Sequence, residues 1–338
     1  MTAGEESSRI AGARFATAGD RPHPERDFVR ALAHLADPGK PATDSYAPAE
    51  REALLALGRP HGVDAILWRK FGGNHEGPAG EVMLHRLGQA MLLDLLRRDI
   101  ADAFAAGGVE ASVVKGPVFA ERLYPVGGDR LFTDIDLMVE EGAMGGAIAA
   151  MGRLGYRRED GLQDGVRRSM EYKFMHPGHR HVLIELHGDM VHYPLLRRRA
   201  RFGRRELLLA GAGDSAAPGA LLATAIVHVT LGHKFERLMM LVDVLQAVRH
   251  LPPADFARFV DTLATMRLGL ECTVCLGVTA RLFEDDAAAE LASRFRAGLK
   301  GRLGGVLVSP QTIVAAQGDA PRASWMRRKT FRLLQYLP

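Results

Sequence analysis

The chain has 338 residues, of which 47% are apolar, and its 44 basic and 40 acidic residues give a formal net charge of +4. This length accommodates one large domain or two ordinary ones, and the apolar fraction suffices for a core without disulfides or structural metal. The balanced charge does not by itself indicate nucleic-acid binding, and only two cysteines exclude a disulfide-built secreted scaffold. Because no stretch resembles a signal peptide or a membrane span, we expect a cytoplasmic protein with no transmembrane segment.

Residue patterns divide the chain into four parts. Residues 1–23 lack periodicity, which predicts a mobile arm, and residues 24–106 have apolar residues at helical spacing. Residues 107–210 alternate between strand and helix patterns, and residues 211–338 are helical again. We therefore expect a small α/β core between two helical segments.

The helical segments contain several separate elements. The N-terminal helices are expected at about 24–37, 48–57, 60–70 and 79–106. The C-terminal segment should begin at Pro218 with one long helix that bends near Gly232.

Strand-like runs in the central part lie at 109–116, 130–140, 170–176 and 181–187. Helical patterns follow the first two runs, and a Pro177-Gly178 turn separates the last two. This order predicts an α+β fold, in which a small mixed sheet with helices on one side is flanked by N- and C-terminal helical segments.

Two aspartates lie in the strand run LFTDIDLMV. Positions i and i+2 of a strand point to the same face about 7 Å apart, so Asp134 and Asp136 could share one or two metal ions. Hard oxygen ligands of this kind suit Mg²⁺ or Mn²⁺. Such a pair also occurs by chance about once in a chain of this size, and the alternative is two solvated carboxylates.

Glu185 is a third acidic residue in an apolar strand run, HVLIELH. An unpaired carboxylate buried there would cost several kcal/mol, which favours a functional role as a third metal ligand or as the base for an attacking hydroxyl. His187 shares its face and either takes part directly or hydrogen-bonds a neighbouring carboxylate.

The segment VVKGPVFA predicts a strand that ends at Lys115-Gly116 and opens a helix. Free backbone N–H groups and the helix dipole favour an anion at such a turn, and the Lys115 ammonium adds a positive charge for a phosphate oxygen. Arg130 is a second candidate phosphate contact. The chain contains no P-loop motif.

Together these segments resemble a known family. VVKGPVFAERLYP, RLFTDIDLMV, LIELH and the helical stretch HVTLGHKFERLMMLVDV are similar to the uncharacterised bacterial nucleotidyltransferases of the polymerase-beta-like superfamily. The resemblance covers roughly residues 50–290. It implies a nucleotidyltransferase core within residues 107–210.

The resemblance also implies roles for individual residues. Asp134, Asp136 and Glu185 would be the metal ligands and catalytic acids, and Lys115, Gly116 and Arg130 would position the nucleotide. Lys234 and Asp243 would lie on a C-terminal helix that faces the cleft, with Lys234 near the triphosphate. The chain departs from the superfamily at Pro117, which follows Lys115-Gly116 where Gly-Ser or Gly-Gly is usual and which lacks an N–H donor.

Cysteines and further histidines have structural explanations beside the functional ones. Cys272 and Cys275 could bind metal or undergo redox chemistry, but their position within a helix favours buried thiols. The histidines at 176, 179 and 181 are typical of a polar hairpin tip, and those at 228 and 233 of core or interface residues.

Two basic segments of the sequence could provide contacts for an RNA partner. Residues 197–205 contain six arginines, and residues 294–338 contain nine basic residues and one acid. The first segment could bind a phosphate backbone or an acidic peptide, and the second could bind RNA, an anionic membrane surface or an acidic partner. The alternatives are a solvated loop for the first and, for the second, a terminal helix that docks its Phe, Leu and Tyr side chains.

The function expected is a Mg²⁺- or Mn²⁺-dependent nucleotidyltransferase. It would move a nucleoside monophosphate from a nucleoside triphosphate, ATP by abundance, to a hydroxyl acceptor on a small molecule or peptide, with release of pyrophosphate. A non-catalytic nucleotide-binding module and a toxin-like enzyme that modifies tRNA are the alternatives. The acceptor, the base and the oligomeric state do not follow from the sequence.

Overall fold

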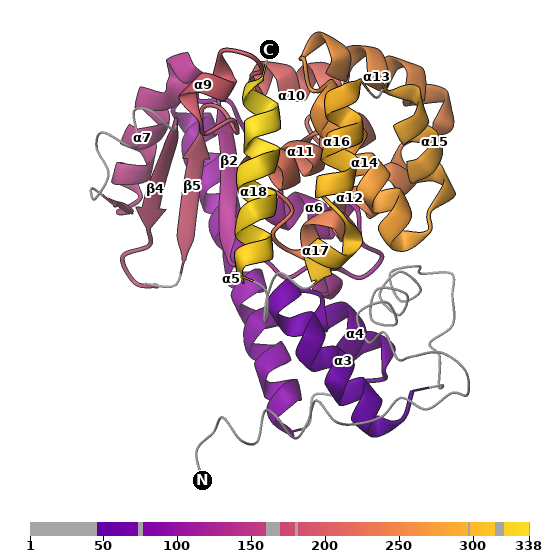
Figure 1. Ribbon diagram of the computed structural model, residues 1–338. Helices are drawn as coiled ribbons and strands as arrows, with labels where there is room; N and C mark the ends of the chain where they lie inside the picture. Colours follow the sequence, from indigo (N-terminus) through magenta and orange to yellow (C-terminus); the bar gives the residue numbers. More distant parts are fainter. Residues whose placement is uncertain are drawn as a thin grey trace, which may run out of the picture.

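The computed structural model shows a five-stranded sheet with helices before and after it in the chain (Figure 1). It describes residues 46–73, 77–159, 170–179, 182–296, 298–314 and 321–337. The arm expected at 1–23 and the helix expected at 24–37 lie outside the described residues. The architecture confirms the α+β fold class, a mixed sheet between two helical segments.

Among the described residues, three helices precede the sheet: α3 (Pro48–His61), α4 (Asp64–Lys70) and α5 (Gly77–Ala106). The sequence predicted a new helix from Pro60, but Pro60 lies inside the last turns of α3. The helix instead ends at Gly62, which has a left-handed conformation with φ of +75° that glycine adopts without strain. The true break between α3 and α4 therefore falls a few residues later than predicted.

The sheet has the strand order β1-β2-β5-β4-β3. Its strands are β1 (Ala111–Val114), β2 (Asp134–Val139), β3 (Arg157–Arg158), β4 (Glu171–Met175) and β5 (Leu183–His187). The neighbouring strands β2 and β5 are parallel, and the other neighbours are antiparallel. This is the predicted mixed sheet, with β3 as a short additional edge strand.

Side chains alternate across β2 as the sequence predicted. Ile135, Leu137 and Val139 pack into a core with α5 and with α7 (Met144–Arg153). Met138, on the opposite face, packs into a second core that includes Phe119 of α6 (Gly116–Arg122) and the C-terminal helices. The expectation of helices on one side only was wrong, because apolar side chains on both faces are covered.

From α9 onward the regular elements of the described residues are helices, most of which pack on one another (Figure 1). They are α9 (Pro194–Arg197), α10 (Arg204–Ala210), α11 (Pro218–Val227), α12 (Leu238–His250), α13 (Phe256–Thr265), α14 (Gly269–Phe283), α15 (Asp286–Arg294), α16 (Leu299–Leu307), α17 (Pro310–Val314) and α18 (Pro321–Tyr336). None of the helices in the described parts of the chain combines the length and apolar character that a membrane span requires.

One long helix from Pro218 was predicted, but the chain forms two. After α11 comes a π-helical turn, His228–Gly232, and then a break in which Lys234 and Phe235 have positive φ angles of +52° and +63°. These left-handed conformations end the helical hydrogen-bond pattern, so α12 starts afresh at Leu238. The break lies close to the predicted bend but is much sharper.

The basic C-terminal segment ends in a docked helix. Phe331 and Leu334 of α18 are buried, whereas Leu333 and Tyr336 are exposed. Docking through the Phe and Leu side chains is therefore confirmed, and the tyrosine does not contribute. Arg327 is buried on the same face of α18, where it donates to Thr312 O, and other basic side chains of this helix form a feature described below.

Candidate active site

Acidic side chains from the parallel strands β2 and β5 meet on one face of the sheet. The β2–β5 register places Asp136 beside Glu185 and Met138 beside His187. Because side chains alternate along a strand, Asp134 and Asp136 point to the same face as Glu185 and His187. The structure thus brings together the three carboxylates that the sequence singled out, and they line a cavity of about 420 Å³.

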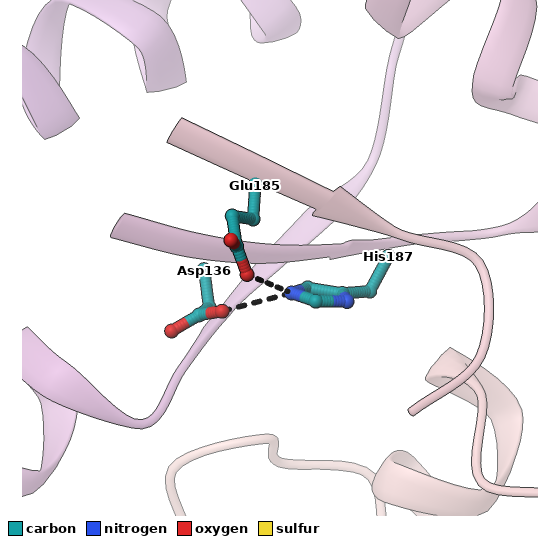
Figure 2. A group of neighbouring side chains, drawn as sticks. All are labelled: Asp136, Glu185 and His187. Carbon is teal, nitrogen blue, oxygen red and sulfur yellow. Dashed lines mark hydrogen bonds and ion pairs between the residues drawn. The ribbon is translucent and has the colours of Figure 1, made fainter. Parts of the chain in front are cut away.

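Figure 2 shows two of these carboxylates, Asp136 and Glu185, converging on one ring nitrogen of His187. Its Nε2 atom lies 2.8 Å from Asp136 Oδ1 and 3.5 Å from Glu185 Oε2. Ligand atoms of Asp136, Glu185 and His187 all lie within 4.8 Å of one another, a spacing that could hold a metal ion. His187 therefore has the carboxylate contact proposed as one of its two alternatives.

Lys115 lies on the opposite side of Asp136. Its Nζ is 2.5 Å from Asp136 Oδ1, and its side chain is only 11% exposed. Lys115 precedes α6 with φ of +60° and ψ of −136°, a conformation that favours glycine. An added Cβ at the next residue, Gly116, would lie 3.2 Å from Phe132 Cβ, so glycine there permits the close approach of α6 to the start of β2.

Charges in the cavity balance one another. Burial and the adjacent Asp136 raise the pKa of Asp134 to about 6. Burial opposes ionisation of Asp136 as well, but Lys115 and His187 outweigh it and hold its pKa below the usual value. Burial would also lower the pKa of His187, yet its hydrogen bonds to Asp136 and Glu185 raise it to about 9. At neutral pH the cavity therefore holds ionised carboxylates beside protonated Lys115 and His187.

Strand β4 and the loop after β5 add residues that the sequence analysis missed. Lys173 Nζ lies 2.6 Å from Glu185 Oε1 and 3.1 Å from Glu171 Oε1. His192 Nδ1 lies 3.3 Å from the other Glu171 oxygen, and burial together with the charge on His187 lowers the His192 pKa to about 3. Glu171, Lys173 and His192 all line the cavity.

Arg130 lines the cavity, but its guanidinium is committed to a buried partner. Its Nε and Nη2 atoms donate to the carboxylate of Asp243 at 2.9–3.2 Å, and Nη1 donates to Leu131 O at 2.7 Å. Tyr124 donates to Asp243 as well, at 2.7 Å. This buried cluster ties the loop before β2 to α12, so it positions Asp134 and its neighbours relative to the C-terminal helices.

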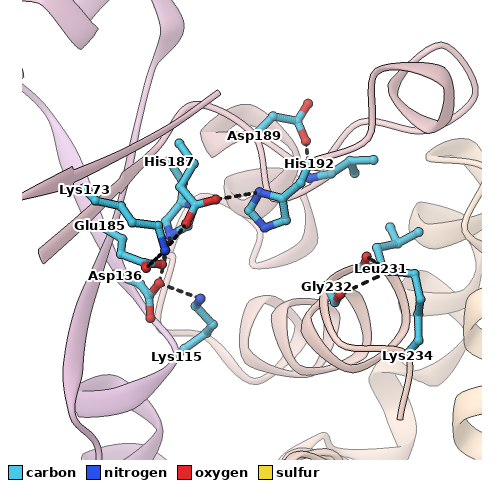
Figure 3. A network of polar contacts seen from close by, with 12 residues as sticks. Lys115, Asp136, Lys173, Glu185, His187, Asp189, His192, Leu231, Gly232 and Lys234 are labelled. Carbon is cyan, nitrogen blue, oxygen red and sulfur yellow. Dashed lines mark hydrogen bonds and ion pairs between the residues drawn. The ribbon is translucent and has the colours of Figure 1, made fainter. Parts of the chain in front are cut away.

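Lys234 was expected on a helix facing the acidic cleft, near the triphosphate, and the structure places it elsewhere. It lies in the break between α11 and α12, and its Nζ donates to Leu231 O at 3.0 Å and Gly232 O at 3.2 Å. Figure 3 shows this side chain well separated from the carboxylates. The left-handed backbone at Lys234 turns the side chain toward a different hollow.

Other residues considered from the sequence have structural roles. Cys272 and Cys275 are buried free thiols, and burial raises the pKa of both. Within residues 197–205, Arg199 pairs with Glu271, Arg201 with Asp189 and Glu141, and Arg204 with Glu110. Half of that arginine run is therefore engaged within the fold, which weakens the case for an RNA-binding loop.

Residues 48–284 match the sequence model of a family described as uncharacterised nucleotidyltransferases. The match spans more than two thirds of the chain and includes the whole sheet and the acidic cavity. The chain thus belongs to this nucleotidyltransferase family. No curated protein and no solved structure shows significant similarity to it.

Proposed function

We propose that the protein is a Mg²⁺- or Mn²⁺-dependent nucleotidyltransferase. The acceptor hydroxyl attacks the α-phosphorus of a nucleoside triphosphate, expected to be ATP, and pyrophosphate leaves. The acceptor belongs to a small molecule or a peptide. The observation that carries this proposal is the convergence of Asp134, Asp136 and Glu185 on one sheet face inside a cavity of about 420 Å³.

Family membership supports nucleotidyl transfer, and the order of elements supports the finer assignment. We assign residues 107–210 as a core of the polymerase-beta-like type, with helical segments at 24–106 and 211–338 on either side. The parallel β2–β5 pair supports this division, because both strands that bear the carboxylates belong to the core.

The donor set fits Mg²⁺ or Mn²⁺. Three carboxylates and one imidazole supply mainly hard oxygen ligands, and Zn²⁺ more often recruits His and Cys. Asp134, Asp136 and Glu185 would hold the metal, while His187 orients two of these carboxylates through its Nε2 contacts. When bound, divalent ions offset negative charge on the triphosphate and on the leaving pyrophosphate.

Glu185 is better suited to the role of metal ligand than to that of general base. Burial opposes its ionisation, but His187, Lys173 and Lys115 hold its pKa below the usual range. A carboxylate with a low pKa accepts a proton weakly, so it contributes little general-base catalysis near neutral pH. Among the two roles considered for Glu185, these contacts support metal ligation.

The reaction can be tested by label transfer. Purified protein is incubated with each α-labelled nucleoside triphosphate, Mg²⁺ or Mn²⁺, and a host extract, beside Asp136→Asn and the control Asp94→Asn, which changes an aspartate of α5 outside the cavity. Wild type and the control should transfer label. Loss of the Asp136 carboxylate should raise the activation barrier by several kcal/mol, so the rate of transfer by Asp136→Asn should fall about a thousandfold or more. Near-normal transfer by a folded Asp136→Asn protein would contradict the proposal.

A non-catalytic nucleotide-binding module is the second candidate. The observation that favours it is the buried ammonium of Lys115, which lies 2.5 Å from Asp136 and neutralises a carboxylate that a catalytic metal requires. This candidate predicts thermal stabilisation by a nucleoside triphosphate without release of pyrophosphate. Pyrophosphate release that depends on Asp136 would eliminate it.

A further inference from the structure

A second hollow lies beside the acidic cavity and encloses about 290 Å³. One side is formed by residues 232–236, in the break between α11 and α12, and the other by α18. Gly232 and His233 line both hollows. In addition, Tyr193 lines this hollow while the preceding residue, His192, lines the acidic cavity. The two hollows therefore share a wall.

Positive charge dominates this second hollow, which we call the basic pocket. Glu236 is the one carboxylate among its lining residues, and it lies 3.5 Å from Arg328 Nη1 and 3.2 Å from His233 Nδ1. Four cationic side chains line the pocket: Lys234, Arg328, Lys329 and Arg332. They exceed the single carboxylate by three formal charges, and like charges gathered in a concave surface concentrate anions.

Lys234 is the most buried of these cations, with 2% of its surface exposed. Its ammonium contacts two backbone carbonyl groups and lies 4.6 Å from the centroid of the Tyr193 ring. Within the described ranges, no carboxylate forms an ion pair with it. Burial and the nearby Arg332 and Arg328 lower the pKa of Lys234 to about 8, and a bound anion would relieve this electrostatic cost.

The backbone holds Lys234 in place before any ligand arrives. Lys234 and Phe235 are both left-handed, which costs about 1–2 kcal/mol for each non-glycine residue and persists only where packing enforces it. That packing is visible at Phe235, which is fully buried and meets Phe331 of α18 edge-on at 5.2 Å between ring centroids. The same helix that anchors the break also supplies the other cations.

One face of α18 lines the basic pocket. Trp325, Arg328, Lys329 and Arg332 are spaced i, i+3, i+4 and i+7, which places them on one side of a helix. Arg332 donates from Nη2 to the Tyr193 hydroxyl, and its Nε is buried without a hydrogen-bond partner among the described residues. This face lies beyond residue 284, where the family match ends.

We infer that the basic pocket binds the phosphate group of the acceptor, so that the acceptor is a phosphorylated small molecule. This inference rests on the proposed function. Guanidinium groups match phosphate oxygens in geometry, and a phosphate dianion suits the excess of three positive charges. Because the two hollows share a wall, a short molecule held by its phosphate in the basic pocket would have to extend only across that wall to place a hydroxyl group in the acidic cavity. A hollow of about 290 Å³ suits a single phosphorylated group better than an extended polynucleotide backbone.

Calorimetry with inorganic phosphate at constant ionic strength tests the pocket itself. Wild type should bind one phosphate, Arg332→Met should bind it about tenfold more weakly or worse, and the exposed Lys329→Glu should weaken it about threefold or more. Arg258→Met, which removes an arginine from α13 outside the pocket, should bind as wild type does. Absence of saturable binding overturns the inference. Binding that is unchanged in both pocket variants but lost in Lys115→Met places the phosphate in the acidic cavity and overturns it too.

A label-transfer experiment tests the role of the acceptor's phosphate. The host extract is treated with alkaline phosphatase, which is then heat-inactivated before labelled nucleoside triphosphate is added. Transfer should fall at least tenfold relative to extract treated with phosphatase that was inactivated beforehand. Undiminished transfer overturns the inference but leaves the proposed function intact. If neither extract accepts label, the proposed function and the acceptor role both fail, whereas the calorimetric result still decides whether the pocket binds phosphate.

Discussion

Lys115 combines a buried positive charge with a strained backbone, and two substitutions separate the effects of the two. Its φ of +60° and ψ of −136° cost about 1–3 kcal/mol for a residue with a Cβ atom, whereas glycine adopts them freely. Lys115→Ala and Lys115→Gly both remove the ammonium that lies 2.5 Å from Asp136 Oδ1. Only the glycine variant also removes the strain, so their difference isolates the backbone contribution.

The expected magnitudes follow from these two contributions. Loss of the buried ion pair should destabilise both variants by about 3 kcal/mol, with His187 still in contact with Asp136. Relief of strain, reduced by about 0.5–1 kcal/mol for the entropy of glycine in the unfolded chain, should leave Lys115→Gly about 1 kcal/mol more stable than Lys115→Ala.

Urea denaturation, with metal chelated, measures this difference directly, and a label-transfer assay on the same samples measures function. Both variants should lose transfer activity equally, because both lack the ammonium. If Lys115→Ala is as stable as Lys115→Gly, the left-handed conformation imposes no cost and the reasoning is wrong. Near-normal transfer by either variant would show that the ammonium is not part of the active site.

Three further predictions concern other parts of the structure. Arg130→Met should destabilise the fold by about 3–5 kcal/mol in urea denaturation, because it leaves Asp243 buried without its cation. A second substitution in the same protein, Asp243→Asn, should recover part of the lost stability, and no recovery would refute the pairing. Gly116→Ala should lower the stability by about 1–3 kcal/mol, because the new Cβ atom would press on the start of β2. Calorimetric melting would detect this loss, and an unchanged melting temperature would argue against that close approach. Burial lowers the pKa of Lys234 to about 8 from 10.5. The Lys234 ammonium therefore loses its proton at a lower pH in the folded chain than in the unfolded chain. The free energy of unfolding should therefore rise between about pH 8 and 10.5 in wild type but not in Lys234→Met, and parallel pH profiles would exclude such a depressed pKa.

The sheet and its acidic face were accessible to sequence analysis because strand periodicity is local. Alternation alone placed Asp134 and Asp136 on one side of their strand and Glu185 and His187 on one side of another. The β2–β5 register confirms that the two faces coincide. The roles of these residues in metal and nucleotide binding stay predictions, since geometry alone does not test them.

Residues that depend on long-range pairing were harder to find. The run MEYKFMH alternates, so Glu171 and Lys173 could have been placed on one face, but only the strand order shows that this face adjoins Glu185. His192 lies in a loop without periodicity. Lys234 was assigned to a helix because its surroundings are helical in composition, and nothing local reveals the left-handed break that redirects it.

The parallel pairing of β2 with β5 also has a consequence for how the chain reaches its fold. A shift of β5 by one residue would turn Glu185 and His187 into the apolar layer beneath α5 and α7 and would expose Ile184 and Leu186 to the acidic cavity. Burying an unpaired carboxylate costs several kcal/mol, so a misaligned sheet is penalised on both faces at once. The carboxylates that we expect to bind metal thus also favour the correct strand alignment, because Glu185 is tolerated only where Lys173 of the neighbouring strand β4 can pair with it.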